Sequence, residues 1–374
     1  MRDVSDRWIE TSQVGGELLA KLVCHPPPAA DSDPFELTLA SASVEQEGGT
    51  GPKWRASIDV KPEVGQDTWG LVSWPGSWFS LEIGWRYGAN DKEMITYGEY
   101  VHSDDPSHNL RGRISLSLTD RWADLDRADY DTTYKPSGGT RVSRVQEAVR
   151  TALSNQQPIS VRLDDDGGSI AGDGEWEKRT QLISDLSKDG GFIAYFDYDG
   201  VFVIEDEPSM GSPIHVFTDG DDADIIDLTK GGRFTQFYNR VSVYPENPDK
   251  LDFTPQAVTI DEPSHPLDPS NNRGVLSVYK YSSPTISSTS SARFRAGRLL
   301  RRVMRQKLER EVKSFNLAHI EPGDTVKIAV QATQTEEKEV SEWGVVKTSF
   351  DLMTGDSSLT LTSSHEPNLA ESEA

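Results

Sequence analysis

The stretch Gly190-Gly-Phe-Ile-Ala-Tyr-Phe-Asp-Tyr-Asp-Gly-Val-Phe-Val-Ile204 contains the strongest hairpin signal in the chain. Asp199-Gly200 stands between two runs of β-branched and aromatic residues, and this dipeptide is favoured in tight hairpin turns because its residues accept a positive φ. The stretch begins with a glycine pair, which is typical of a helix end. It therefore predicts a helix that ends near Gly190 and is followed by two antiparallel strands.

The residues before this hairpin have apolar spacings of three and four, which indicate helices. One helix is expected over 142–152 and a second over 176–190, with a short strand over 159–163 between them. These elements predict a small α+β domain over 141–213. A polar segment over 129–140 contains proline and glycine and is interpreted as a linker.

Short strands with alternating apolar and polar residues occupy the first third of the chain. This period of two is typical of strands with one solvated face. Turn residues separate the strands, as in Gly48-Gly-Thr-Gly-Pro52. The pattern predicts an antiparallel barrel or sandwich, assigned to residues 1–128. The expected strands are 35–39, 56–60, 78–83, 94–97 and 113–118.

The last part of the chain predicts a second β-barrel-like domain over 214–365. Within it, the Pro- and Asp-rich residues 245–290 are expected to form an extended excursion, and 290–311 to form one long helix. The polar residues 366–374 are expected to fray. The apolar face of the helix is expected to pack on the last barrel; it consists of Ala292, Ala296, Leu299, Leu300 and Val303. The predicted fold class is mainly β, with an α+β insertion between two β-rich domains.

The charge balance narrows the possible functions. The 374 residues include 61 acidic and 38 basic side chains, for a formal net charge of −23. Such a field repels nucleic acid and anionic lipid, so general nucleic-acid binding is disfavoured. No apolar run has the length of a membrane span, and the N-terminus lacks the apolar core of a signal peptide. We therefore expect the chain to fold in a cytoplasm.

Motifs for catalysis or metal binding are not found in the sequence. The one cysteine, Cys24, excludes a disulfide framework and a multi-thiolate metal site. Gly167-Gly-Ser-Ile-Ala171 departs from a nucleophile elbow at its last position and is interpreted as a surface turn. The histidines stand singly, and no glycine cluster has phosphate-loop or dinucleotide spacing. The sequence therefore assigns no catalytic residue, no cofactor and no metal.

Carboxylates are too abundant to identify a site by themselves. Pairs that would suit glycoside hydrolysis arise by chance among 61 acidic residues. The Asp-rich segments 164–166 and 219–224 offer oxygen ligands for calcium, but neither matches an EF-hand loop. Solvated turns are the favoured interpretation of both segments.

Aromatic residues cluster between Trp69 and Tyr87. Exposed on one face, they would form a platform for sugars. Their alternation along strands favours barrel core together with an interface, and both interpretations stay open. The members are Trp69, Trp74, Trp78, Phe79, Trp85 and Tyr87.

Cationic residues are concentrated on the expected helix 290–311 of this acidic chain. A nucleic-acid contact is one interpretation. We favour pairing with carboxylates of the same chain or of a neighbouring subunit, because a desolvated Arg–carboxylate pair fixes register and partner choice. The hypothesis assigns an interface to Arg298, Arg301, Arg305, Asp221, Asp222 and Asp224. Replacing the three arginines with Gln is expected to weaken assembly without unfolding the chain.

The order of motifs resembles that of baseplate-hub, or distal minor tail, proteins of long-tailed phages, especially siphophage-type phages of actinobacteria. The resemblance covers the chain from about Phe35 to Leu361. The motifs that carry it are Ile95-Thr-Tyr-Gly-Glu-Tyr100 within strands over 78–100, the 112–120 strand, the 190–204 hairpin with its helix, Tyr281-Ser-Ser-Pro-Thr-Ile286, the 290–310 helix and Glu321-Pro-Gly-Asp-Thr-Val326.

The resemblance implies a structural virion protein at the tail tip and not an enzyme. It implies two tail-tube-like β-barrel domains that flank a small α/β domain, and a homotrimeric hub ring that joins the tail tube to the tip and lines the DNA channel. The implied partners are the tail-tube protein, the distal tail protein, the tape measure protein and other tail-tip proteins. Genomic DNA would pass without sequence-specific binding, and no membrane is involved. The expected location is the virion tail tip, after synthesis in the host cytoplasm.

Two other functions stay open from the sequence. One is a tail-associated carbohydrate-binding module for host recognition that uses the aromatic residues between Trp69 and Tyr87. The other is a polysaccharide hydrolase that uses an Asp/Glu pair. Glycan binding by the isolated chain would favour the first, and turnover of cell-wall or capsular polysaccharide the second.

Overall fold

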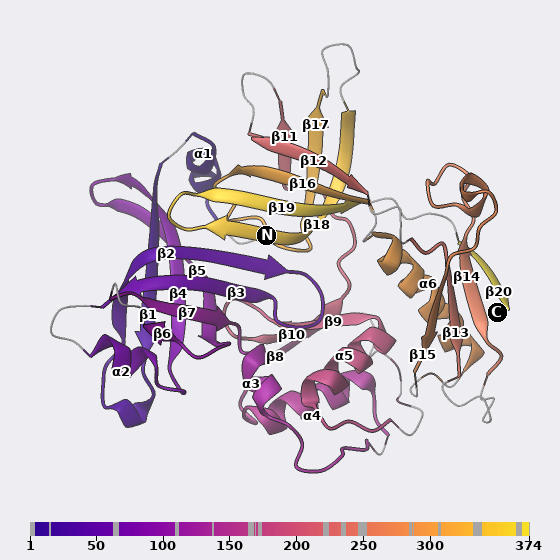
Figure 1. Cartoon of the computed structure of the whole chain (residues 1–374), viewed down its shortest axis with the longest axis horizontal. Coiled ribbons are helices and arrows are strands. Elements are labelled where there is room, and N and C mark those ends of the chain that lie inside the picture. Colours follow the sequence, from indigo (N-terminus) through magenta and orange to yellow (C-terminus); the bar gives the residue numbers. More distant parts are fainter. Residues whose placement is uncertain are drawn as a thin grey trace.

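The strands and helices form four units in the computed structural model (Figure 1). They are a closed barrel, an α/β unit, a second β unit and a sheet-and-helix unit, most of which is inserted into the second β unit. In the described part of the chain, no helix is both long and apolar enough to cross a membrane. The structure describes residues 4–14, 16–62, 67–108, 112–136, 138–163, 174–219, 224–232, 237–245, 253–283, 288–305, 308–331, 339–363 and 369–373, as well as Gly168, Ile170 and Ile286.

The first unit is a closed barrel of six strands. Their order is β1-β4-β5-β7-β3-β2, and β2 pairs back with β1. The strands are β1 (Glu17–His25), β2 (Phe35–Glu47), β3 (Trp54–Lys61), β4 (Trp78–Gly88), β5 (Asp91–His102) and β7 (Ile114–Thr119). The other elements of this unit are α1 (Asp6–Val14), η1 (Pro28–Ala30), α2 (Thr68–Val72) and β6 (Ser107–His108).

Alternate side chains fill the barrel. On β3, Trp54 and Ile58 are buried, whereas Arg55 between them is exposed. Trp8 of α1 is also fully buried, and its ring meets Trp85 edge-on with centroids 6.2 Å apart. The strands predicted from alternation are confirmed, and β1, which no alternation indicated, completes the barrel.

The second unit combines three helices and a three-stranded sheet around one core. Its sheet order is β8-β10-β9, with β10 parallel to β8 and antiparallel to β9. Thr140 and Ser143 cap the first turn of α4 reciprocally, and Gly191 ends α5 at a φ of 73°, which glycine adopts without strain. The predicted helices and hairpin are confirmed, except that the second helix begins at Arg179 and Trp176 before it forms a β-bridge with Tyr134. The elements are α3 (Trp122–Arg127), α4 (Arg141–Ala152), β8 (Ile159–Arg162), α5 (Arg179–Gly190), β9 (Phe192–Phe196) and β10 (Phe202–Asp206).

The third unit is a six-stranded sheet with its own apolar core, which includes Phe217, Ile328 and Leu361. The order is β12-β16-β19-β18-β17-β11, and β11 runs parallel to β17. Together with the barrel and the α/β unit, it confirms the predicted fold class. The strands are β11 (His215–Thr218), β12 (Asp227–Gly232), β16 (Leu308–Phe315), β17 (Thr325–Val330), β18 (Glu339–Asp351) and β19 (Asp356–Ser363).

The fourth unit corrects two expectations. Residues 245–290 do not form only an extended excursion, because they contribute two strands and a short helix to a four-stranded sheet ordered β15-β13-β14-β20. The tail expected to fray supplies β20, which pairs with β14. Because β15 is parallel to β13, it needs a crossover that local periodicity does not reveal. The elements are β13 (Arg240–Tyr244), β14 (Gln256–Ile260), η2 (Pro269–Asn272), β15 (Val278–Ser282) and β20 (Leu369–Glu373).

Helix α6 (Thr289–Arg305) is shorter than predicted, since the chain continues as strand β16 from Leu308. The predicted apolar stripe is confirmed, because Ala292, Ala296 and Leu300 are fully buried. Its partner is different from the one expected. The stripe packs on β13 and β14 of the fourth unit, not on the last barrel.

The turn between β2 and β3 holds the barrel against two other units. Gly48 N–H donates to the carbonyl of Val346 on β18 at 2.9 Å, and Gly51 N–H donates to the carbonyl of Ala194 on β9 at 3.1 Å. The indole of Trp54 donates to the carbonyl of Phe196 on β9 at 3.0 Å. These bonds cover the free edge of β9, and the turn therefore fixes the α/β unit to the barrel.

A buried carboxylate secures the base of the same turn. Asp120 accepts backbone N–H bonds from Lys53 at 2.7 Å, Trp54 at 3.1 Å and Trp122 at 2.9 Å. Complete burial raises the pKa of Asp120 to about 7, although the three N–H donors oppose the shift. The side chain connects the β2–β3 turn, the end of β7 and the start of α3.

We predict that Asp120 makes stability decrease as the pH rises. Its pKa is about 7 in the folded chain against an ordinary value of 3.8, so between these pH values the folded state binds a proton that the unfolded state has lost. The contribution of this carboxyl to stability is therefore greatest near pH 4, falls as pH rises, and becomes constant above about pH 7. Denaturant unfolding of the wild type and of Asp120→Asn at several pH values measures it. The difference in unfolding free energy should shift by a few kcal/mol across this window. A constant difference would contradict the prediction.

Candidate functional site: a polar sheet face shared by two β units

Strand β18 pairs with β2, and this pairing joins the barrel and the third unit in one continuous sheet (Figure 1). The register runs from Lys347 opposite Glu47 to Asp351 opposite Ser43. The resulting ladder is β7-β3-β2-β18-β19-β16-β12. Directly opposed residues of neighbouring strands point to the same side of a sheet. The outward sides of the two units therefore form a single surface.

This surface, here named the polar face, consists of short hydroxyl side chains and charged side chains. The register places Ser117, Ser57 and Ser43 in one row across three strands of the barrel. The inward residues of the same strands belong to the core. The other members of the polar face are Ser41, Glu45, Glu47, Arg55, Asp59, Ser115, Thr119, Asp227, Thr229, Glu311, Lys313, Lys347, Ser349, Asp351, Ser358 and Thr360.

Acidic side chains outnumber basic ones on the polar face, and the basic ones lie beside carboxylates. Lys347 Nζ is 2.9 Å from Glu45 Oε2, and Lys313 Nζ is 3.9 Å from Asp227 Oδ2. Arg55, the remaining cation of the face, lies directly opposite Glu45 in the register. A phosphate group that approaches this surface therefore meets two lysines with carboxylate neighbours, one arginine opposite a carboxylate in the register, and hydroxyl groups.

Hydroxyl groups also bind a carboxylate of the face. Asp59 on β3 accepts hydrogen bonds from Ser41 on β2 at 3.0 Å and from Ser115 on β7 at 2.6 Å. The side chains of three neighbouring strands are thus linked across the surface. This arrangement keeps the acidic side chain close to the sheet.

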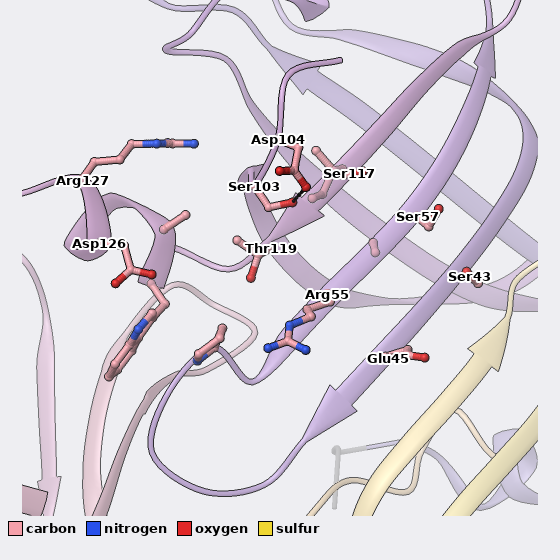
Figure 2. A pocket seen from close by; sticks show the side chains of 15 residues that line it. Ser43, Glu45, Arg55, Ser57, Ser103, Asp104, Ser117, Thr119, Asp126 and Arg127 are labelled. Carbon is pink, nitrogen blue, oxygen red and sulfur yellow. Dashed lines mark hydrogen bonds between the residues drawn. The ribbon is translucent and has the colours of Figure 1, made fainter. Parts of the chain in front are cut away.

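A groove of about 590 Å³ lies on the polar face beside α3 (Figure 2). Figure 2 shows side chains of β2, β3 and β7 along one side, with Asp126 and Arg127 of α3 across from them. The described residues that line the groove include neither histidine nor cysteine. Its lining provides hydroxyl groups and opposite charges, but no paired nucleophile and base.

The predicted interface residues are not brought together in the described structure. Arg298 and Arg301 lie on α6, and of Arg305 only the backbone is described. Asp224 belongs to the third unit, where its carboxylate accepts from Thr218 N–H at 2.8 Å and contacts His215 Nε2 at 2.7 Å. Among the described residues, these partners of its carboxylate lie within the third unit. Asp221 and Asp222 lie outside the described residues.

Three arginines of helix α6 contact other parts of the chain. Arg293 Nε is 3.2 Å from Glu371 Oε2 on β20. Arg295 is almost fully buried, with Nε 3.9 Å from Asp189 Oδ1 on α5. The guanidinium of Arg298 lies over Gly191, in the space that a Cβ would need. Pairing with carboxylates of the same chain is thus confirmed for two arginines, and the α/β unit is the neighbour of this side of the helix.

Asp189 was not predicted as a site residue, although it joins three segments. Besides Arg295, its carboxylate accepts from the hydroxyls of Tyr281 at 2.8 Å and Ser283 at 2.5 Å. Burial lowers the pKa of Arg295, while Tyr281 and Asp189 oppose that shift. The sequence holds one signal for Asp189, because it continues the helical spacing of Leu182 and Leu186 and so falls on the buried side of α5.

The aromatic cluster divides between core and surface. Phe79 and Trp85 are buried in the barrel, which confirms the core interpretation for them. Trp69, Trp74 and Trp78 are 38%, 42% and 36% exposed. Residues 164–166 and most of 219–224 lie outside the described residues. Elsewhere in the described chain, no group of three or more His, Cys, Asp or Glu side chains could hold a metal ion.

Solved phage tail proteins share this fold over most of the chain. The tail protein from Neisseria meningitidis MC58 matches with a TM-score of 0.62 at 10% identity, over 92% of this chain and 96% of that one. The 43 kDa tail protein of prophage MuSo2 from Shewanella oneidensis matches with a TM-score of 0.58 at 13% identity, over 91% and 97%. Prophage tail protein gp18 from Listeria monocytogenes EGD-e matches with a TM-score of 0.56 at 12% identity, over 91% and 94%. No protein-family model matches the sequence, and the search of curated proteins found no match.

We predict that replacing Asp189 with Asn lowers the free energy of unfolding by about 2–4 kcal/mol, because it leaves Arg295 buried without a counter-charge. Denaturant unfolding measures the loss. The matched control is Asp91→Asn, which removes the exposed pair with Arg7 and should cost no more than about 1 kcal/mol. Equal losses in the two variants would show that the buried pair does not hold α6 to α5.

Proposed function

We propose that this chain is a structural virion protein of a phage tail tip. In this role it is a baseplate hub that forms a trimeric ring, joins the tail tube to the tip and lines the DNA channel. The observation that carries the proposal is the β2–β18 pairing, which merges two β units into one sheet with a shared polar face. The fold of solved tail proteins over more than nine-tenths of the chain supports it.

The chemistry of the polar face suits a channel for DNA. Double-stranded DNA presents about one negative charge per 1.7 Å, and proteins retain it through free Lys and Arg side chains. On the polar face, Lys347 and Lys313 have carboxylate neighbours, and hydroxyl groups fill the rows between the charges. The net charge of −23 adds a repulsive field. DNA would therefore slide along this surface without binding.

The arrangement of two β units in one chain suits a ring of three. Three copies would present six such units, which matches a threefold tip to a sixfold tail tube. In the described part of the chain, β11 pairs with β17 and β12 pairs with β16, each on one side. Unpaired sheet edges invite contact with another chain, and a closed ring would cover them. The tail-tube, distal tail and tape measure proteins are the proposed neighbours. An assembly role of Arg298, Arg301 and Arg305 stays a prediction.

The ring is tested by the mass of the purified chain, alone and with the tail-tube protein of the same phage. We expect a trimer at high protein concentration and a complex with a threefold axis by electron microscopy. A chain that stays monomeric under both conditions, with no threefold axis in an assembled tail, would overturn the ring.

If the polar face lines the channel, lysines that are added to this face without carboxylate neighbours should make the chain bind DNA. A triple variant with Ser43→Lys, Ser57→Lys and Ser349→Lys should bind linear duplex DNA, whereas the wild type should not. Its log affinity should fall against log salt with a slope of about −3 when three phosphates are engaged. Fluorescence anisotropy at several salt concentrations measures this.

The matched control carries the same charge on exposed positions away from the polar face. It combines Asn155→Lys, Gln156→Lys and Ser290→Lys. In the assembled ring, the control should bind DNA much more weakly than the polar-face variant, because its lysines would lie outside the channel. Equal binding by both variants, or strong binding by the wild type, would contradict the assignment of the channel surface.

A further inference from the structure

A second cavity lies where the barrel meets the α/β unit. Its volume is about 480 Å³, and it is partly open to solvent. The loop before β4 and the strands β4 and β5 supply one wall, and the other comes from Asp124 of α3 and from Arg121, which precedes this helix. It is separate from the groove on the polar face, whose lining comes from β2, β3, β7 and other residues of α3.

Trp78 provides a flat apolar surface in this cavity. Its ring stacks on the imidazole of His25, with centroids 3.7 Å apart and planes 5° from parallel. His25 is itself held by a 2.8 Å hydrogen bond to Ser80 Oγ. His25 covers one face of the indole, and Trp78, which lines the cavity, remains 36% exposed. A large aromatic ring is thus held in place while part of its surface stays accessible.

Polar groups of both kinds surround the ring. Glu99 lies beside Gly200 of the α/β hairpin, and in the described part of the chain its carboxylate makes no hydrogen bond. Burial raises the pKa of Glu99, and Asp197 and Asp199 act in the same direction, whereas Arg121 opposes them. The cavity therefore contains a partly desolvated carboxylate that makes no hydrogen bond to a described residue.

Arg121 supplies the donors. One of its terminal nitrogens donates to Gln157 Oε1 at 2.5 Å, and its Nε lies 3.6 Å from Asp124 Oδ2. These contacts fix the guanidinium, which has more N–H groups than those contacts use. An aromatic plane with fixed donors and acceptors around it is a typical pattern of a small-molecule site.

We propose that this cavity binds one pyranose unit of a neutral glycan, with the sugar ring stacked on Trp78. The apolar C–H face of a pyranose would lie on the open face of the indole. Adjacent sugar hydroxyls both donate and accept, so they can pair with the Glu99 carboxylate and the Arg121 guanidinium at once. A cationic ligand would be repelled by Arg121, and an anionic ligand by Glu99 and Asp124. The inference goes beyond the hub role and does not depend on it.

A glycan array with the purified full-length chain tests the proposal, followed by calorimetric titration of the best neutral oligosaccharide. We expect a dissociation constant in the range of about 0.1–1 mM, as for a single shallow subsite. Trp78→Ala should weaken binding at least about tenfold, and Glu99→Gln should weaken it by a smaller factor because one acceptor oxygen remains. Circular dichroism and thermal melting check that both variants are folded.

Trp74→Ala is the matched control, since Trp74 is exposed to a similar extent but does not line the cavity. This variant should bind the glycan as the wild type does. Absence of binding to every neutral glycan on the array would overturn the proposal. So would equal losses in Trp74→Ala and Trp78→Ala, or preferential binding of charged glycans. Loss of self-association in Trp78→Ala without any glycan binding would assign the ring to a subunit contact instead.

Discussion

Strand β2 has three neighbours although a strand has only two edges, and its length makes this possible. One edge pairs with β3 along most of the strand. The other edge pairs first with β1, through Phe35–Leu37, and then with β18, through Ser43–Glu47. A strand of typical length, about 5–6 residues, would reach only one of these partners. The 13 residues of β2 therefore close the barrel and join it to the third unit at the same time.

The interfaces between units contain buried carboxylates, each of which contacts several segments of the chain. Asp120 accepts three backbone N–H bonds where the β2–β3 turn, β7 and α3 meet. Asp189 meets Arg295, Tyr281 and Ser283 where α5, α6 and the fourth unit meet. Burying such groups contributes little net stability, but a wrong arrangement would leave each of them without partners. Their effect is to select one relative placement of the units.

Local sequence patterns predicted the elements whose partners are close along the chain. The 192–204 hairpin, α4 and α5 are examples, because their turns and caps are encoded in adjacent residues. Strand β1 was missed because most of its residues are half-buried on both sides, which removes the alternation. Strands β15 and β20 were missed because each pairs only with strands distant in the sequence. The fourth unit therefore could not be derived from periodicity.

The candidate surface was predictable in its residues but not in its extent. Alternation on β3 and β7 indicates that Ser57 and Ser117 point outward, whereas the pairing with β18 depends on register between distant strands. The helix stripe likewise predicted one buried side of α6, but not the burial of Arg295, which lies beside that stripe. Several basic side chains thus form ion pairs, either at the interfaces between units or on the polar face. The acidic residues are in excess over these pairs, so the chain keeps a net negative charge, which disfavours the retention of nucleic acid.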